Sequence, residues 1–156
     1  MKKKLLAFLV VIMCFIPSIT YASQVSSSSF KDELSSFLDR DVTDEDVHNW
    51  SLMISSLKAD GISAEVINIH TIKPLDEELV IASATKTGKV VTVEEHSVVG
   101  GLGSAVAEVL SEKAPTRMMR IGVNDQFGES GPALELIHKY GLDAEGIYKK
   151  VKAFCK

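Results

Sequence analysis

Apolar residues recur at two different spacings between residue 62 and the carboxyl end of the chain. Short apolar and β-branched runs predict strands at 63–69, 89–93 and 118–123, and the run at 89–93 is apolar on both faces, as in a central parallel strand. Residues at helical spacing predict helices in "KPLDEELVIASATKTG", "GSAVAEVLSEKAP", "GPALELIHKYG" and "DAEGIYKKVKAF". The alternation predicts an α/β fold, a Rossmann-like three-layer domain with a mostly parallel sheet and right-handed crossovers.

Cap residues mark where these helices begin and end. Gly88 and Gly141 follow two of the apolar stripes, and Asp143 stands at the start of the last helix. We expect buried stripes formed by Leu75, Leu79 and Ala82 in the first of these helices, and by Ile147, Val151 and Phe154 in the last.

The chain before residue 62 is predicted to be helical or flexible. Thr43 and Asp46 form a capping box, and the helix that follows carries Val47, Trp50, Ile54 and Leu57 on one stripe. Residues 23–42 are interpreted as a polar linker with one short helix, "FKDELSSFLDR". The chain therefore divides into three segments, at 1–22, 23–42 and 43–156.

Residues 1–22 have the pattern of a secretory signal peptide. Three lysines precede an apolar run, and Thr20 and Ala22 stand before a cleavage position at Ser23. The apolar run is shorter than the roughly 20 residues that span a bilayer, although an uncleaved anchor is the alternative. We expect a secreted or periplasmic protein that meets the membrane only through this segment, or a cytoplasmic one if the signal does not function.

Composition narrows the classes of partner. The chain has 156 residues and a formal net charge of −4, which becomes −7 without residues 1–22, so nucleic acid is not an expected partner. Only Cys155 remains after residue 22, and we expect a free thiol on the surface. The acidic residues at 39–46 lack the glycine and the final glutamate of a calcium loop, and the four histidines lack ligand spacing, so no metal site is predicted.

The segment "VTVEEHSVVGGLGSAVAEVL" has the order strand, glycine loop, helix that is typical of phosphate-binding loops. It lacks the third glycine of a dinucleotide fingerprint and the lysine of a P-loop. Glu94 and Glu95 would also repel a phosphate unless they point away. A tight turn that lets the helix pack closely on the sheet is favoured, with an anion site as the alternative.

His96 is the one catalytic candidate, and a weak one. It follows the carboxyl end of its strand, where open α/β sheets carry ligand sites, and Glu95 beside it could orient its ring. No serine or cysteine stands in a nucleophile setting. A surface or interface histidine is the alternative.

Three segments together resemble the C-terminal domain of transketolases: "IHTIKPLD", "VTVEEHSVVGGLGSAV" and "FGESG". Their order and spacing match over residues 57–151. The likeness is strongest to transketolases built from two subunits, and the domain is similar to those of deoxyxylulose-phosphate synthase and of the β-subunits of 2-oxoacid dehydrogenases.

The resemblance implies a domain that packs and forms dimer contacts without catalysing alone. In that family thiamine diphosphate and a magnesium ion bind between two other domains, so no cofactor is expected in this chain. The implied partner is a thiamine-diphosphate-binding subunit or a second copy of the chain. The residues that match the segment facing the other domains are Glu95, His96, Gly100, Gly101 and Gly103.

The sequence departs from the family in two ways. The thiamine-diphosphate-binding domains are absent, and the hydrophobic first strand of the family domain is missing where "FKDELSSFLDRDVTDEDVHNW" stands. Without that strand its neighbours have unpaired edges, unless the chain fills the place otherwise or a partner does. A truncated or fused gene would explain both departures. An exported, non-catalytic binding protein that reuses the fold is the alternative function.

Overall fold

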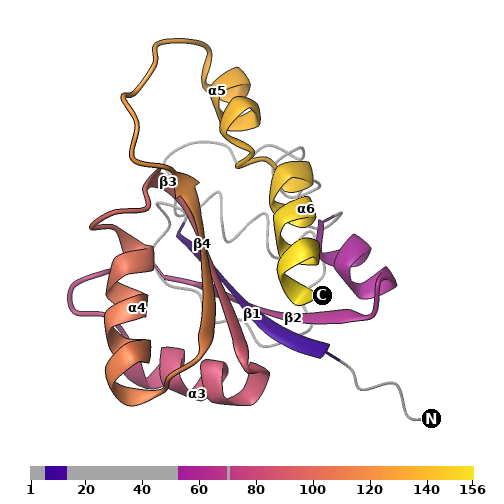
Figure 1. Ribbon diagram of the computed structural model, residues 1–156, viewed down its shortest axis with the longest axis vertical. Coiled ribbons are helices and arrows are strands. Elements are labelled where there is room, and N and C mark those ends of the chain that lie inside the picture. The colour runs from indigo at the N-terminus through magenta and orange to yellow at the C-terminus, as the bar shows by residue number, and fades with distance from the viewer. Residues whose placement is uncertain (1–5, 14–52, 70) are drawn as a thin grey trace, which may run out of the picture.

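The computed structural model describes residues 6–13, 53–69 and 71–156 (Figure 1). The predictions for the linker at 23–42, for the capping box at Thr43 and Asp46, and for the cleavage position at Ser23 lie outside these residues.

A four-stranded parallel sheet forms the centre of the protein, as the strand and helix pattern predicts. Its strands follow the order β2-β1-β3-β4, and every neighbouring pair is parallel. The strands are β1 (Leu6–Met13), β2 (Ile62–Asn68), β3 (Lys89–Ser97) and β4 (Arg117–Val123). The α/β fold class is therefore confirmed.

The strand between β2 and β3 comes from the amino-terminal apolar segment. β1 pairs with β2 from Leu6 opposite Ile62 onward, and with β3 from Leu9 opposite Val90 onward. The stretch where the family's first strand is expected lies outside the described residues. The chain thus fills the central place with residues 6–13, which the sequence pattern assigns to a signal peptide.

Helices cover both faces of the sheet (Figure 1). One face packs against α3 (Glu77–Thr87) and α4 (Leu102–Lys113), and the other against the helical residues 53–59 and α6 (Ala144–Cys155). Two hydrophobic cores result, which confirms the three-layer arrangement. The helix α5 (Ala133–Tyr140) lies beyond the end of the sheet and has no buried residue.

The predicted helix ends are confirmed. Gly88 and Gly141 end α3 and α5 in left-handed conformations, with φ of 74° and 63°. The side chain of Asp143 accepts a hydrogen bond from the backbone N–H of Gly146 and so caps α6. Asp76 caps α3 in the same way, through the backbone N–H of Leu79.

Three expectations need correction. The strand predicted at 89–93 extends to Ser97, because Glu94 is buried like the apolar residues before it. The buried face of α3 carries Val80, Ser83 and Ala84, and Ala82 is exposed. Cys155 lies in a hydrophobic core and not on the surface, and its burial raises the pKa of the thiol.

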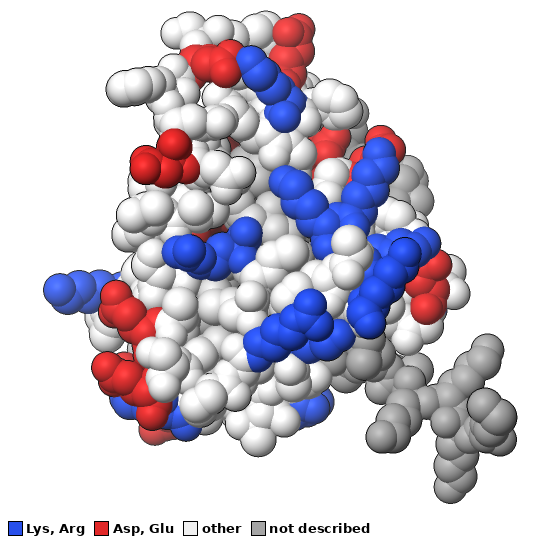
Figure 2. All heavy atoms as spheres, in the orientation of Figure 1, with Lys and Arg blue, Asp and Glu red and all other residues white. Residues whose placement is uncertain are grey.

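The surface charge is unevenly distributed. Figure 2 shows Lys and Arg gathered over the face that carries β4 and α6, although the chain as a whole is acidic. Arg117 and Lys89 belong to this face, and their charges lie 4.6 and 5.9 Å from the centre of the Phe154 ring.

Among the described residues, no helix combines the length and the apolar composition that crossing a membrane requires.

The cores give a first testable prediction. Ile147 is 0% exposed in the core beneath α6, so Ile147→Ala should lower the free energy of unfolding by about 2–5 kcal/mol. Leu134→Ala is the matched control, because Leu134 is 74% exposed and its loss should change stability by less than about 0.5 kcal/mol. Urea denaturation of both variants measures the difference, and equal effects would contradict this packing.

Candidate functional site

The glycine loop after β3 does not present a free anion site. The backbone N–H of Leu102 donates to Oε2 of Glu94 over 2.8 Å, and that of Gly103 donates to Oε1 over 2.9 Å. These amides open α4, and a phosphate would use such amides. The tight-turn interpretation of the loop therefore fits the structure, and the chain's own carboxylate occupies the place of the anion.

Two glycines of this loop make room for neighbouring side chains. A Cβ on Gly101 would lie 2.0 Å from Oε2 of Glu94, and a Cβ on Gly103 would lie 2.7 Å from Cδ of Arg120. Both glycines are buried inside the domain. Of the five residues expected at an interface, Glu95, His96 and Gly100 are the exposed ones.

His96 is exposed at the end of β3. Its Nδ1 lies 3.1 Å from the carbonyl oxygen of Ser97. Within the described part of the chain, no hydrogen bond joins His96 to Glu95, so the expected orientation of the ring by Glu95 is not found. A catalytic role for His96 stays a prediction, as does an interface role for Glu95, His96 and Gly100.

Hydrogen bonds hold the backbone of the loop between Ser97 and Gly101. Val98 donates to the carbonyl of Val123 over 3.0 Å, and Gly100 donates to the hydroxyl of Ser104 over 2.9 Å. The guanidinium of Arg120 donates to the carbonyl of Val98 over 2.8 Å. The loop is thus fixed by its neighbours on both sides before any partner binds.

Exposed apolar side chains lie at the same end of the molecule as this loop. Val99 in the loop is 61% exposed, Phe127 after β4 is 98% exposed, and Leu134 in α5 is 74% exposed. Figure 1 shows that the segment after β4 and α5 both extend beyond the sheet. We call Val99, Phe127 and Leu134 the apolar tip.

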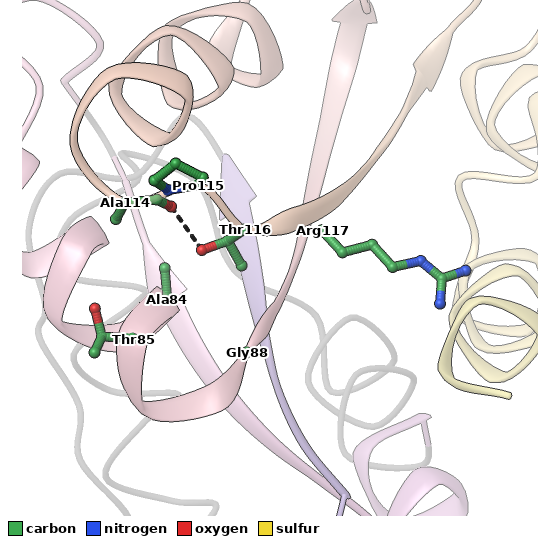
Figure 3. A pocket seen from close by; sticks show the side chains of 7 residues that line it. All are labelled: Ala84, Thr85, Gly88, Ala114, Pro115, Thr116 and Arg117. Atoms are coloured by element: carbon green, nitrogen blue, oxygen red, sulfur yellow. Dashed lines mark hydrogen bonds between the residues drawn. The ribbon is translucent and has the colours of Figure 1, made fainter.

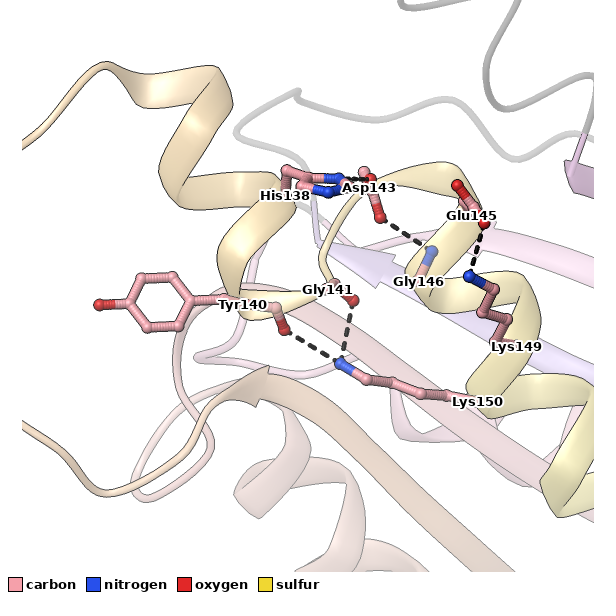
Figure 4. A network of polar contacts seen from close by, with 8 residues as sticks. All are labelled: His138, Tyr140, Gly141, Asp143, Glu145, Gly146, Lys149 and Lys150. Atoms are coloured by element: carbon pink, nitrogen blue, oxygen red, sulfur yellow. Dashed lines mark hydrogen bonds and ion pairs between the residues drawn. The ribbon is translucent and has the colours of Figure 1, made fainter.

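A polar network joins α5 to α6 (Figure 4). His138 Nδ1 lies 2.6 Å from Oδ2 of Asp143, whose other oxygen accepts from the N–H of Gly146. The ammonium of Lys150 donates to the carbonyls of Tyr140 and Gly141, and its burial lowers its pKa. The network sets the direction in which α5 leaves the domain.

Asp143 makes this junction sensitive to pH. Burial would raise the pKa of its carboxyl, but the hydrogen bonds from His138 and from the Gly146 amide outweigh burial, so the pKa lies below its ordinary value. A depressed pKa stabilises the folded state at pH values above the ordinary pKa, and that stability is lost as the pH falls through the folded pKa.

We therefore expect Asp143→Ala to lower the free energy of unfolding by about 1 kcal/mol at pH 7, and by less in acid. Asp143→Asn keeps the capping oxygen but cannot titrate, so it should retain most of the stability and lose the part of the acid dependence that Asp143 contributes. Chemical denaturation at pH 7 and near pH 3 measures both effects. A constant difference between the wild type and Asp143→Ala across this range would contradict the assignment.

A shallow hollow lies at the opposite end of the sheet (Figure 3). It has a volume of about 360 Å³ and is lined by Ala84, Thr85, Gly88, Ala114, Pro115, Thr116 and Arg117. Arg117 points away from it toward the C-terminal helix, and the remaining lining is small and uncharged. The hollow brings together no group for acid, base or metal chemistry.

The comparison with protein families decides the identity of the fold. A family model described as "Transketolase, C-terminal domain" matches residues 45–147. The chain belongs to this family. The resemblance read from the three sequence segments is therefore confirmed.

Two curated relatives show which proteins carry this domain. The chain is 53% identical over 98 residues to the 6-deoxy-6-sulfo-D-fructose transketolase subunit SqwH of Clostridium sp. (strain MSTE9), a match that covers 63% of this chain and 30% of that one. It is 48% identical over 99 residues to 1-deoxy-D-xylulose-5-phosphate synthase of Syntrophotalea carbinolica (strain DSM 2380 / NBRC 103641 / GraBd1), covering 63% and 16%. The matched region thus spans less than a third of either relative.

A solved structure supports the same assignment. It is titled "Split gene transketolase, inactive beta4 tetramer" and superimposes with a TM-score of 0.67 at 36% identity. The superposition covers 99% of this chain and 40% of that one. The solved structure therefore supports the assignment of this chain to the transketolase C-terminal domain family.

Proposed function

We propose that this chain is the C-terminal part of a transketolase-type enzyme divided between polypeptides, and that it acts by binding a larger chain that carries the thiamine-diphosphate-binding domains. The relatives support a divided enzyme, because one is named a transketolase subunit and the solved structure is titled a split-gene transketolase. In this proposal the chain contributes domain packing and dimer contacts and does not catalyse ketol transfer alone.

The observation that carries the proposal is the uncovered apolar surface at one end of the domain. The apolar face of the amphipathic helix α5 is only half-buried at Leu136, Ile137 and Tyr140, and its Leu134 is 74% exposed. Phe127, a few residues before α5, is 98% exposed. An amphipathic helix is stable in water when its apolar face packs on something. We infer that the larger chain covers the apolar tip.

The cofactor belongs to the larger chain in this proposal. The transketolase and synthase relatives are thiamine-diphosphate enzymes, and a diphosphate group would need free amides or cations. The amides at the start of α4 are already bonded to Glu94, so they do not fit a diphosphate. Within residues 6–13, 53–69 and 71–156, no group of three side chains that could hold a metal ion occurs.

The docking surface gives a direct test. We expect the tagged full chain to form a complex with the chain that carries the thiamine-diphosphate-binding domains, and native mass spectrometry should show both together. Phe127→Asp should weaken the complex at least about 30-fold, since a buried aromatic contact is worth 2 kcal/mol or more. Phe127 is almost fully exposed, so this substitution should leave the fold intact.

Thr85→Asp is the matched control, because Thr85 is exposed at the opposite end of the domain. It should bind like the wild type. A wild-type chain that forms no complex with a thiamine-diphosphate-binding chain would contradict the proposal, and so would a complex that Phe127→Asp leaves unchanged.

The alternative is an exported, non-catalytic binding protein, and the signal-like pattern of residues 1–22 favours it. The sheet argues against that alternative, because cleavage of a signal peptide at residues 1–22 would remove β1, which pairs with β2 and β3. We infer that the folded chain keeps these residues and is not secreted.

Intact-mass measurement of the tagged protein from its own cells tests this inference. We expect a species that begins at Met1 or lacks only that residue. A soluble, folded species that begins at Ser23 would overturn it, would show export, and would leave the transketolase relationship as ancestry only.

A further inference from the structure

Glu94 is the one carboxylate that the described residues bury almost completely, with 1% of its surface exposed. A buried charge is costly unless it is paired and hydrogen-bonded. No lysine or arginine within the described ranges forms an ion pair with it. Its partners are instead the two amides at the start of α4, which carry the positive end of the helix dipole.

The geometry is that of an anion held at a helix start. Each carboxylate oxygen of Glu94 accepts one amide hydrogen, from Leu102 or from Gly103, at distances typical of charge-assisted hydrogen bonds. Gly101 leaves the space that the carboxylate fills, since a Cβ there would lie 2.0 Å from Oε2. The glycine and the helix start therefore serve an anion that is part of the chain.

The same side chain closes the loop that follows it. Glu94 ends the buried part of β3, and its carboxylate contacts Leu102 and Gly103, so one residue ties together both ends of the segment 95–101. That segment carries the exposed His96 and Val99. Glu94 thus holds the two ends of this segment, alongside the hydrogen bonds of Val98 and Gly100 within it.

We propose that Glu94 is a positioning residue: its carboxylate permanently occupies the anion site at the start of α4, excludes external phosphate from it, and fixes the segment 95–101, which presents His96 at the end of β3 and Val99 in the loop to the partner chain. The last part rests on the proposed function. The first two parts concern this chain alone and are tested without a partner.

The experiment uses the full-length chain with Glu94→Ala and a formate probe. Removal of the carboxylate leaves two buried amides without an acceptor, so the thermal midpoint should fall by roughly 5–10 °C. Formate carries the missing carboxylate and should restore part of that loss in a saturable way. At the same ionic strength, sodium chloride should not restore it.

Glu95→Ala is the matched control, because Glu95 is the exposed neighbour on the same strand. It should neither lower the midpoint nor respond to formate. Inorganic phosphate should stabilise the wild type and Glu95→Ala equally and without saturation, as a kosmotropic salt does, because the helix-start amides of both are already bonded. A wild type that phosphate stabilises in a saturable way, or a Glu94→Ala variant that formate and chloride affect equally, would overturn the proposal.

Glu94→Gln keeps the test decisive if the alanine variant does not fold. Glutamine offers one acceptor oxygen and one NH₂ group, so one of the two amides loses its partner. Nitrogen–proton NMR spectra should show shifted amide signals for Leu102 or Gly103 and for the loop from Ser97 to Gly101. Unchanged loop signals would mean that Glu94 does not position the loop.

Partner binding separates this inference from the proposed function. If Glu94→Ala weakens the complex and formate restores the affinity, both stand. If formate restores the midpoint and the loop signals but the wild type binds no thiamine-diphosphate-binding chain, the proposed function fails and the internal anion site stands. If the wild type binds and Glu94→Ala binds equally well with a displaced loop, the positioning role fails.

Discussion

The burial of β3 on both faces is the constraint on which the rest of the structure depends. Val91 and Val93 pack into the core beneath α6, whereas Val90 packs into the core beneath α3 and α4. One strand therefore joins both hydrophobic cores, and the layers on either side are placed relative to it. The apolar residues of this strand all pack in the two cores. Any catalytic or binding role therefore belongs to the exposed end of the strand and to the loops beyond it.

At the exposed end of β3, the carboxylate of Glu94 occupies a helix start that resembles a phosphate-binding site. A strand, a glycine loop and a helix start attract phosphate in many proteins, and the physical reason is the set of free amides in the first turn. The same amides serve equally well to neutralise a buried side chain of the protein itself. In this domain Glu94 takes that place, so the loop becomes a rigid part of the surface.

Much of the fold follows from local patterns in the sequence. The apolar runs locate three strands, and Gly88, Gly141 and Asp143 mark helix ends because their roles depend on nearby backbone alone. The burial of Cys155 does not follow from position near the end of the chain, because α6 packs the thiol into a core. The sequence also does not predict the pairing of β1, because a signal peptide and a central strand both contain an apolar run.

The contact between Glu94 and α4 was beyond the reach of sequence patterns for a different reason. Two adjacent glutamates look equivalent in the sequence, yet the pleat of the strand turns Glu94 inward and leaves Glu95 exposed. Gly101 was the available signal in the sequence, because a glycine often marks a place where another group approaches the backbone closely. In the structure that group is the carboxylate of Glu94. The apolar tip is visible only once helix packing shows what remains uncovered.

The position of β1 also has a consequence for the order of synthesis. Residues 6–13 are synthesised before either of their partner strands, and both of their edges are paired only after β2 and then β3 have been made, some eighty residues later. Throughout that interval the apolar segment has no partner strand in the sheet. Chaperones and the secretion machinery both recognise exposed apolar segments, so the rate of elongation up to residue 97 governs how long the new chain is accessible to either.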